Sequence, residues 1–184
     1  MTSAKRALDV GASLVAFGVF GPVLVVAAAL IKAEDGGPVL FWQERCGRAL
    51  VPFQICKLRT MRDGEVTRVG RWLRRTGIDE VAQFVNVLRG EMTVVGPRPL
   101  TRADLQRLGW LTDADRAALK PGITGPAQVL GGQGAAASRR LDRRYADEMG
   151  VRVDVELIAI SFAINLLGKH RVRAWLAAHH RFAT

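Results

Sequence analysis

Residues 68–100 read RVGRWLRRTGIDEVAQFVNVLRGEMTVVGPRPL, and this stretch sets two adjacent carboxylates between a basic segment and a rigid Pro97-Arg98-Pro99. We expect a helix to begin here with Thr76 as its N-cap, because an acidic residue, Asp79, follows three positions later. Apolar residues recur at helical spacing beyond that point, and Gly90 is a natural end of the helix.

The carboxylate pair, Asp79 and Glu80, has an ordinary structural explanation. Acidic side chains are common in a first helical turn because the partial positive charge there favours them. A functional explanation is favoured by the surroundings, since six arginines lie near the pair in the sequence: Arg68, Arg71, Arg74, Arg75, Arg89 and Arg98.

The length and charge of the chain limit what it can be. With 184 residues and a net charge of +10, one domain with an anionic partner is expected. Nucleic acid, an anionic membrane and a phosphorylated small molecule all meet that description. The two cysteines lack CxxC spacing and the three histidines lack HExxH spacing, so buried reduced thiols and surface or interfacial histidines are predicted.

Residues 10–31 form an uncharged apolar segment near the N-terminus. The segment is long enough to cross the roughly 30 Å hydrocarbon core as a helix. It is too long for the apolar region of a secretory signal peptide, typically about 7–15 residues, and long for a buried soluble helix. We therefore predict a retained membrane element.

The middle of this segment, Gly21-Pro22, predicts a kink or break. Lys5 and Arg6 precede the segment and a basic domain follows it. Because basic residues prefer the cytoplasmic side, a spanning helix would force one of these two basic flanks across the membrane. We expect a re-entrant helix that returns to the face it entered, with Lys5 and Arg6 reaching lipid phosphates. A simple signal anchor is the alternative.

The remainder predicts an α/β domain, mostly helical, with a few short strands near residues 39–42, 53–57 and 92–95. Between residues 52 and 75, seven Lys or Arg and two acids are spread over turns and short elements. That spread lets guanidinium groups converge on a diphosphate from several directions. The predicted division is a membrane-inserted part, residues 1–32, and a membrane-associated catalytic domain, residues 33–184.

The C-terminal half carries weaker signals. We expect a polar helical region at residues 101–120, a turn-rich connection at 121–126 and a mobile loop at 129–138. Residues 155–167 are too short to span a membrane comfortably and predict a core or interfacial helix. Residues 172–182 predict a basic amphipathic helix at the membrane surface.

The order of motifs resembles that of the bacterial sugar transferase family, the monotopic polyprenyl-phosphate phosphoglycosyl transferases, over about residues 5–160. The matching positions include Lys5-Arg6, Gln43 with Arg45, Lys57-Leu58-Arg59, Arg74-Arg75, Asp79-Glu80, Asn86-Val87-Leu88, Pro97-Arg98-Pro99, Pro121-Gly122-Ile123-Thr124-Gly125, Gln128, Asp142 and Tyr145. The chain departs from the pattern at Gly77-Ile78, Val81-Ala82, Pro126 and Gly132.

The resemblance implies transfer of a phospho-sugar from a nucleotide diphosphate sugar, with uridine the usual base, to polyprenyl phosphate such as undecaprenyl phosphate. It implies a cytoplasmic-face enzyme of the bacterial inner membrane that serves glycoconjugate or polysaccharide biosynthesis. The residues alone do not decide between the two carboxylates, and the family pattern makes Asp79 the nucleophile and Glu80 its support, with Mg²⁺ on both. The resemblance also implies substrate-binding roles, listed here: Lys57, Arg59, Arg74, Arg75, Arg98, Gln128, Asp142 and Tyr145.

Two other classes remain open from the sequence. A membrane-tethered nucleic-acid- or anion-binding protein would explain the charge, but no helix-turn-helix, RNA-recognition or zinc pattern is visible and nucleic acid is not expected as a partner. A structural or inactive relative is the third class, given Pro126 and Gly132. The sequence leaves the sugar and a homo-oligomeric state undetermined.

Overall fold

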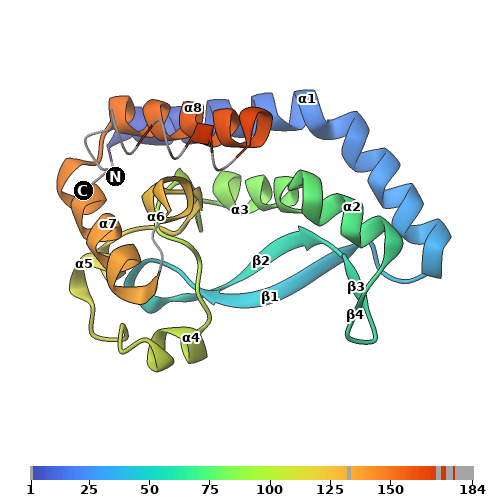
Figure 1. Cartoon of the computed structure of the whole chain (residues 1–184), viewed down its shortest axis with the longest axis horizontal. Helices are drawn as coiled ribbons and strands as arrows, with labels where there is room; N and C mark the ends of the chain where they lie inside the picture. Colours follow the sequence, from blue (N-terminus) through green and yellow to red (C-terminus); the bar gives the residue numbers. More distant parts are fainter. Residues whose placement is uncertain (1, 132–133, 169–170, 173–175, 177–184) are drawn as a thin grey trace.

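The computed structural model describes residues 2–131, 134–168, 171–172 and 176. It opens with α1, Ser3–Asp35, a 33-residue helix whose most apolar 18 residues have a mean hydropathy of 2.6. The Thr2 hydroxyl accepts from the Lys5 amide at one end, and Gly36 ends the helix with a φ of 70°. The helix continues through Pro22, so the break expected there is absent, although Figure 1 shows α1 bending partway along its length.

Within the described residues, the strands form three pairs. The first is an antiparallel hairpin of β1, Leu40–Cys46, and β2, Pro52–Leu58; the second is β3, Met61–Arg62, with β4, Glu65–Val66. The third pairs β5, Thr93–Val95, in parallel with β6, Gly122–Thr124. The three predicted strands are therefore confirmed, whereas β6 lies where only turns were expected.

The segment around the carboxylates differs from the expected single helix. Helix α2, Arg68–Thr76, ends at Gly77 with a φ of 73°, a 3-10 helix η2 follows over Ile78–Gln83, and α3 is Phe84–Arg89. Thr76 is therefore the last residue of a helix and not an N-cap, and its hydroxyl donates to the carbonyls of Trp72 and Leu73. The stop at Gly90 is confirmed.

Helices make up most of the regular structure described after residue 100. A 3-10 turn, η1, lies earlier at Arg48–Leu50, and the later helices are α4, Arg102–Arg107; α5, Ala114–Ala118; α6, Pro126–Leu130; α7, Gly134–Glu148; and α8, Val151–Leu167. The mobile loop predicted at 129–138 is wrong in its described part, because residues 134–138 open α7. Most of the surface helix predicted at 172–182 lies outside the described residues.

Helices α1 and α8 lie side by side along one face of the molecule (Figure 1). The inner face of α8 joins the main core through Val153 and Leu157. This core also contains Ile55, Val87, Met92 and Val95. Large apolar side chains remain exposed on both helices: Leu14, Val15, Val19, Val25, Val26 and Leu30 on α1, and Val155, Phe162 and Leu167 on α8. This pair of helices therefore presents a broad apolar surface.

Both ends of α1 are bound to the rest of the domain by charged groups. At the N-terminal end, Lys5 is buried and its Nζ donates to Asp154 of α8, to the Tyr145 hydroxyl and to the Val95 carbonyl. At the C-terminal end, Asp35 forms a bidentate pair with Arg59. The expectation that Lys5 reaches lipid phosphates is therefore wrong, because its ammonium group is enclosed by protein.

Arg6 is also engaged inside the domain. Its guanidinium donates to the carbonyls of Val87 and Leu88, at 2.6 and 2.7 Å, near the end of α3. Free carbonyls at a helix C-terminus are natural partners for a cation. Arg6 thus fixes the first turn of α1 against α3.

Candidate active site

The carboxylate pair sits at the junction between α2 and η2. The left-handed Gly77 turns the chain after α2 and places Asp79 and Glu80 in the first turn of η2. Asp79 is buried, at 8% exposure, whereas the Glu80 side chain is 44% exposed. The two neighbours therefore have different environments, one enclosed and one open to solvent.

Strand β2 brings a cation to this pair. The Lys57 Nζ lies 2.9 Å from Glu80 Oε1. Beside Lys57, strand β2 is bound to α3 by Asn86, whose side chain accepts from the Cys56 amide at 3.0 Å and donates to the Gln54 carbonyl at 2.7 Å. Asn86 therefore occupies the outer edge of β2 as a neighbouring strand would.

The electrostatics single out Asp79. Burial raises the pKa of its carboxyl, and the nearby Glu80 charge raises it further, while Lys57 and Arg74 oppose the shift. A partly desolvated carboxylate beside cations is a common arrangement in active sites.

A large cleft opens in front of these residues, with a volume of about 1000 Å³. Its polar end is lined by Arg45, Lys57, Thr76, Glu80, Arg98 and Gln128. Its other walls come from the apolar helices and include Leu8, Val15, Val19, Phe20, Ile158 and Phe162. The cleft thus joins a charged site to the apolar surface formed by α1 and α8.

The loop that carries Arg98 is held by close backbone packing. A Cβ on Gly122 would lie 2.1 Å from the Gly96 amide nitrogen, and one on Gly125 would lie 2.0 Å from the Gly96 carbonyl oxygen. Only glycine permits such an approach, which brings β6 and the following turn against the Pro97-Arg98-Pro99 loop. Gln128 enters the cleft from α6, just beyond this turn, and its amide donates to the Ile123 carbonyl.

Four of the sequence-predicted groups are thus brought together at the cleft: Glu80, Lys57, Arg98 and Gln128, with Asp79 directly adjacent to Glu80. Arg45 matches the family motif but had no predicted role, and it also lines the cleft. Burial lowers the pKa of its guanidinium, and the nearby Arg98 charge lowers it further. Arg45 lies two residues after Gln43 in a segment predicted to include a strand, and side chains two residues apart point to the same face of a strand. This spacing is the sequence signal that could have placed Arg45 and Gln43 on one face.

The other predicted binding residues do not line this cleft. Arg59 is paired with Asp35, and the Arg74 Nε donates to the Thr60 hydroxyl at 2.9 Å, while Arg75 is exposed on α2. The remaining two are buried: Asp142 pairs with Arg116, and the Tyr145 hydroxyl donates to Asp154.

Comparison with known proteins gives consistent matches. A family model described as bacterial sugar transferase matches residues 1–168. The chain is 44% identical over 156 residues to the UDP-glucose:undecaprenyl-phosphate glucose-1-phosphate transferase of Caulobacter vibrioides, covering 76% of this chain and 58% of that protein. It is 39% identical over 153 residues to the UDP-N-acetylgalactosamine-undecaprenyl-phosphate N-acetylgalactosaminephosphotransferase of Aeromonas hydrophila, covering 72% of this chain and 35% of that protein.

A relative of similar length is the exopolysaccharide production protein PSS of Rhizobium leguminosarum bv. phaseoli. It is 37% identical over 183 residues, which cover 84% of this chain and 90% of that protein. The chain therefore spans 58% of the Caulobacter protein, 35% of the Aeromonas protein and 90% of the Rhizobium protein.

Proposed function

The chain belongs to the bacterial sugar transferase family, and we propose that it transfers a phospho-sugar from a uridine diphosphate sugar to polyprenyl phosphate. The observation that carries the proposal is the cleft, which joins a cationic site beside two carboxylates to an apolar wall. A donor diphosphate suits the first part and an isoprenoid chain suits the second.

In the first step, a carboxylate oxygen of Asp79 attacks the phosphorus that bears the sugar. The bond between this phosphorus and the bridging oxygen breaks, and uridine monophosphate leaves with that oxygen. The product is an acyl phosphate that carries the sugar, and covalent catalysis of this kind divides one difficult displacement into two easier ones. The burial of Asp79 supports this role, because a desolvated carboxylate is a stronger nucleophile once it is ionised.

In the second step, a phosphate oxygen of the lipid attacks the same phosphorus. The bond to Asp79 breaks, the carboxylate is restored and polyprenyl-diphosphate-sugar is formed. Arg98, Arg45 and Lys57 line the space in which phosphoryl charge would develop. Such fixed cations stabilise phosphoryl transfer because they need no reorganisation during the reaction.

Mg²⁺ fits the carboxylates that are present. Among the described residues no group of three or more His, Cys, Asp or Glu could hold a metal. Mg²⁺, however, commonly binds one or two protein carboxylates and completes its shell with water and substrate phosphates. Asp79 and Glu80 would hold the ion, which when bound would neutralise diphosphate charge; Lys57, paired with Glu80, orients that carboxylate.

The position of α1 supports a same-face topology. A spanning helix would deliver its two ends to opposite sides of the membrane, but here Lys5 and Asp35, near the two ends, are both paired within one domain. The exposed apolar residues lie between these pairs. We infer that the middle of α1 enters one leaflet and that the catalytic domain, residues 33–184, rests on the cytoplasmic face of the inner membrane.

The reaction is tested by incubating the purified chain with a uridine diphosphate sugar and Mg²⁺, without lipid. Intact-protein mass measurement should detect an added phospho-sugar, and Asp79→Asn should abolish both adduct and turnover. Arg75→Gln is a matched control, because this exposed arginine does not line the cleft and should leave adduct formation unchanged. Full turnover by Asp79→Asn would remove Asp79 from the role.

The topology is tested by a single cysteine at residue 3 in a chain lacking Cys46 and Cys56. An impermeant thiol reagent added to intact cells should leave it unmodified, and the same reagent added to opened cells should label it. Labelling from the periplasmic side of intact cells would mean that α1 spans the membrane.

A further inference from the structure

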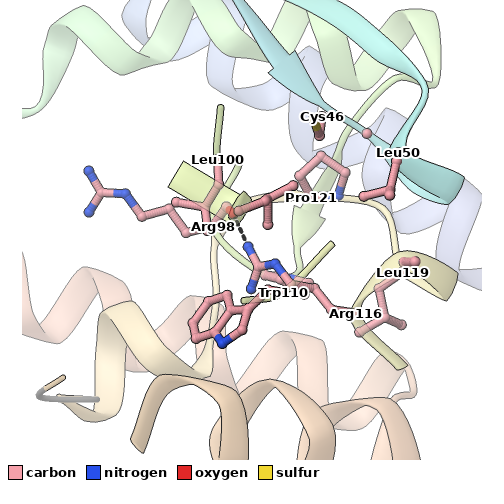
Figure 2. Close-up of a pocket in the computed structure, with 12 residues that line it drawn as sticks. Cys46, Leu50, Arg98, Leu100, Trp110, Arg116, Leu119 and Pro121 are labelled. Carbon is pink, nitrogen blue, oxygen red and sulfur yellow. Dashed lines mark hydrogen bonds between the residues drawn. The ribbon is translucent and has the colours of Figure 1, made fainter. Parts of the chain in front are cut away.

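The Arg98 backbone is held from behind by a second arginine. Arg116 of α5 donates through Nη2 to the Arg98 carbonyl, as the dashed line in Figure 2 shows. The Arg98 side chain extends away from this bond in the same view, and Arg98 is among the residues that line the cleft. The Arg116 side chain itself is not part of that lining.

Arg116 is in turn oriented by two neighbours. Its Nη1 donates to Asp142 Oδ2 of α7, and its guanidinium carbon lies 5.1 Å from the centre of the Trp110 ring. The Arg116 side chain is 13% exposed and that of Asp142 is 5% exposed. The planar guanidinium therefore donates one hydrogen bond to a carboxylate and another to the Arg98 carbonyl. A lysine could not reproduce this geometry.

Backbone hydrogen bonds hold the chain on both sides of Arg98: the Gly96 amide donates to the Thr124 carbonyl, and the Leu100 carbonyl accepts from the Cys46 amide, both at 2.9 Å. The flanking prolines set two backbone φ angles and remove two amide donors. The carbonyl of Pro97 accepts from the Gly122 amide at 2.8 Å, which leaves the Arg98 carbonyl as the next backbone group to be held. Arg116 supplies that bond from α5.

We propose that Arg116, oriented by Asp142, is a positioning residue that fixes the direction in which Arg98 enters the cleft. The inference rests on the proposed function, because it concerns the step in which Arg98 meets the donor diphosphate. It also gives Asp142 a role through Arg116 and Arg98 in place of direct contact with substrate.

The test is a double-mutant cycle on the rate of adduct formation from a uridine diphosphate sugar. Arg116→Gln should lower the donor-step kcat/KM by roughly 10- to 100-fold, since small displacements of a charged group in an active site have effects of this size. In an Arg98→Ala background the same substitution should change the residual rate by less than about twofold, because coupled residues are non-additive.

A second variant guards against simple unfolding. Asp142→Asn keeps the shape of the side chain and an oxygen acceptor, and its smaller loss should also vanish in the Arg98→Ala background. Arg143→Gln is the matched control: it breaks another pair between α7 and α5, Arg143 with Asp115, which touches neither Arg98 nor the cleft. This variant should retain the wild-type rate.

The outcomes separate the two proposals. Losses from Arg116→Gln and Arg98→Ala that multiply, or an Arg116→Gln variant as fast as the wild type, would overturn the positioning role alone. A wild-type chain that forms no adduct and releases no uridine monophosphate would overturn the proposed function and the positioning role with it.

Discussion

Asn86 offers a sharp test of how the site is held together. Its fully buried side chain accepts from the Cys56 amide and donates to the Gln54 carbonyl and to Glu91. Asn86→Ala would leave the buried Cys56 amide without a partner, which costs about 1–3 kcal/mol, and would remove further bonds worth about 0.5–1.5 kcal/mol each. We expect a net loss of about 2–4 kcal/mol in the free energy of unfolding.

For a chain of this size, that loss corresponds to a fall in Tm of roughly 4–16 °C. The rate of adduct formation should fall as well, even well below the Tm, because Cys56 adjoins Lys57 and α3 directly follows the 3-10 helix that carries Glu80. Thermal unfolding in detergent and mass-detected adduct formation at a low temperature measure the two effects separately.

The matched control is Glu91→Gln, which keeps an acceptor for the Asn86 amide and removes only the charge. This variant should lose less than about 1 kcal/mol, the typical contribution of one hydrogen bond. If Asn86→Ala unfolded within 2 °C of the wild type, on the order of 1 kcal/mol or less, the idea that Asn86 fixes the edge of β2 would be refuted.

Three further predictions concern metal, pH and packing. Chelation of Mg²⁺ should abolish the Asp79 adduct, and added Mg²⁺ should restore it; adduct formation in excess chelator would exclude the ion from this step. Burial raises the pKa of Asp142 to about 6, although Arg116 opposes the shift. The protonated Asp142 carboxyl therefore contributes most to stability below the usual pKa of 3.8, and this contribution is lost as the pH rises to 6. The Tm of Asp142→Asn relative to wild type should therefore rise over that range and level off above pH 7, and a flat difference would contradict the shift. Leu157→Ala, at a fully buried position, should lower the free energy of unfolding by about 2–5 kcal/mol, whereas Val155→Ala, on the exposed apolar face, should change it by less than about 0.5 kcal/mol; equal Tm losses would contradict the assigned burial.

Local patterns were sufficient for the elements with strong periodicity or length. The uncharged run at residues 10–31 predicted a helical segment there, although not its continuity through Pro22, and the segments at 39–42 and 53–57 predicted two strands, although not their pairing as a hairpin. The strand β6 was missed because it has only three residues, begins with Gly122 and is followed by Gly125, and the tight packing of both glycines against Gly96 is a tertiary effect. Sequence patterns of turn and short parallel strand are similar at such lengths.

The error at Thr76 has a different cause. A Thr followed by an acid three residues later matches an N-terminal pattern, but Gly77 between them is equally a C-terminal signal, and its left-handed conformation ended α2. Two local rules competed there, and packing of Leu73 into the core around Ile31 and Leu58 favoured the earlier helix.

For the site, the sequence motifs included residues that the structure places at or beside the cleft, such as Asp79, Glu80 and Arg98. The family resemblance implied a substrate-binding role for Arg59, and its pairing with Asp35, 24 residues away, has no local signal in the sequence. The same limit applies to Arg116, whose pairing with Asp142 spans 26 residues.

The buried pair of Lys5 and Asp154 has a consequence for how the chain is made. The two residues are 149 positions apart, so the lysine leaves the ribosome long before its partner is synthesised. At about 5–20 residues per second, the delay is on the order of 7 to 30 seconds. During that interval the ammonium group must remain hydrated, because an unpaired charge is costly inside either protein or lipid. The N-terminal end of α1 therefore has to stay in water until α8 has been synthesised, and only then can α1 take its final position against the domain.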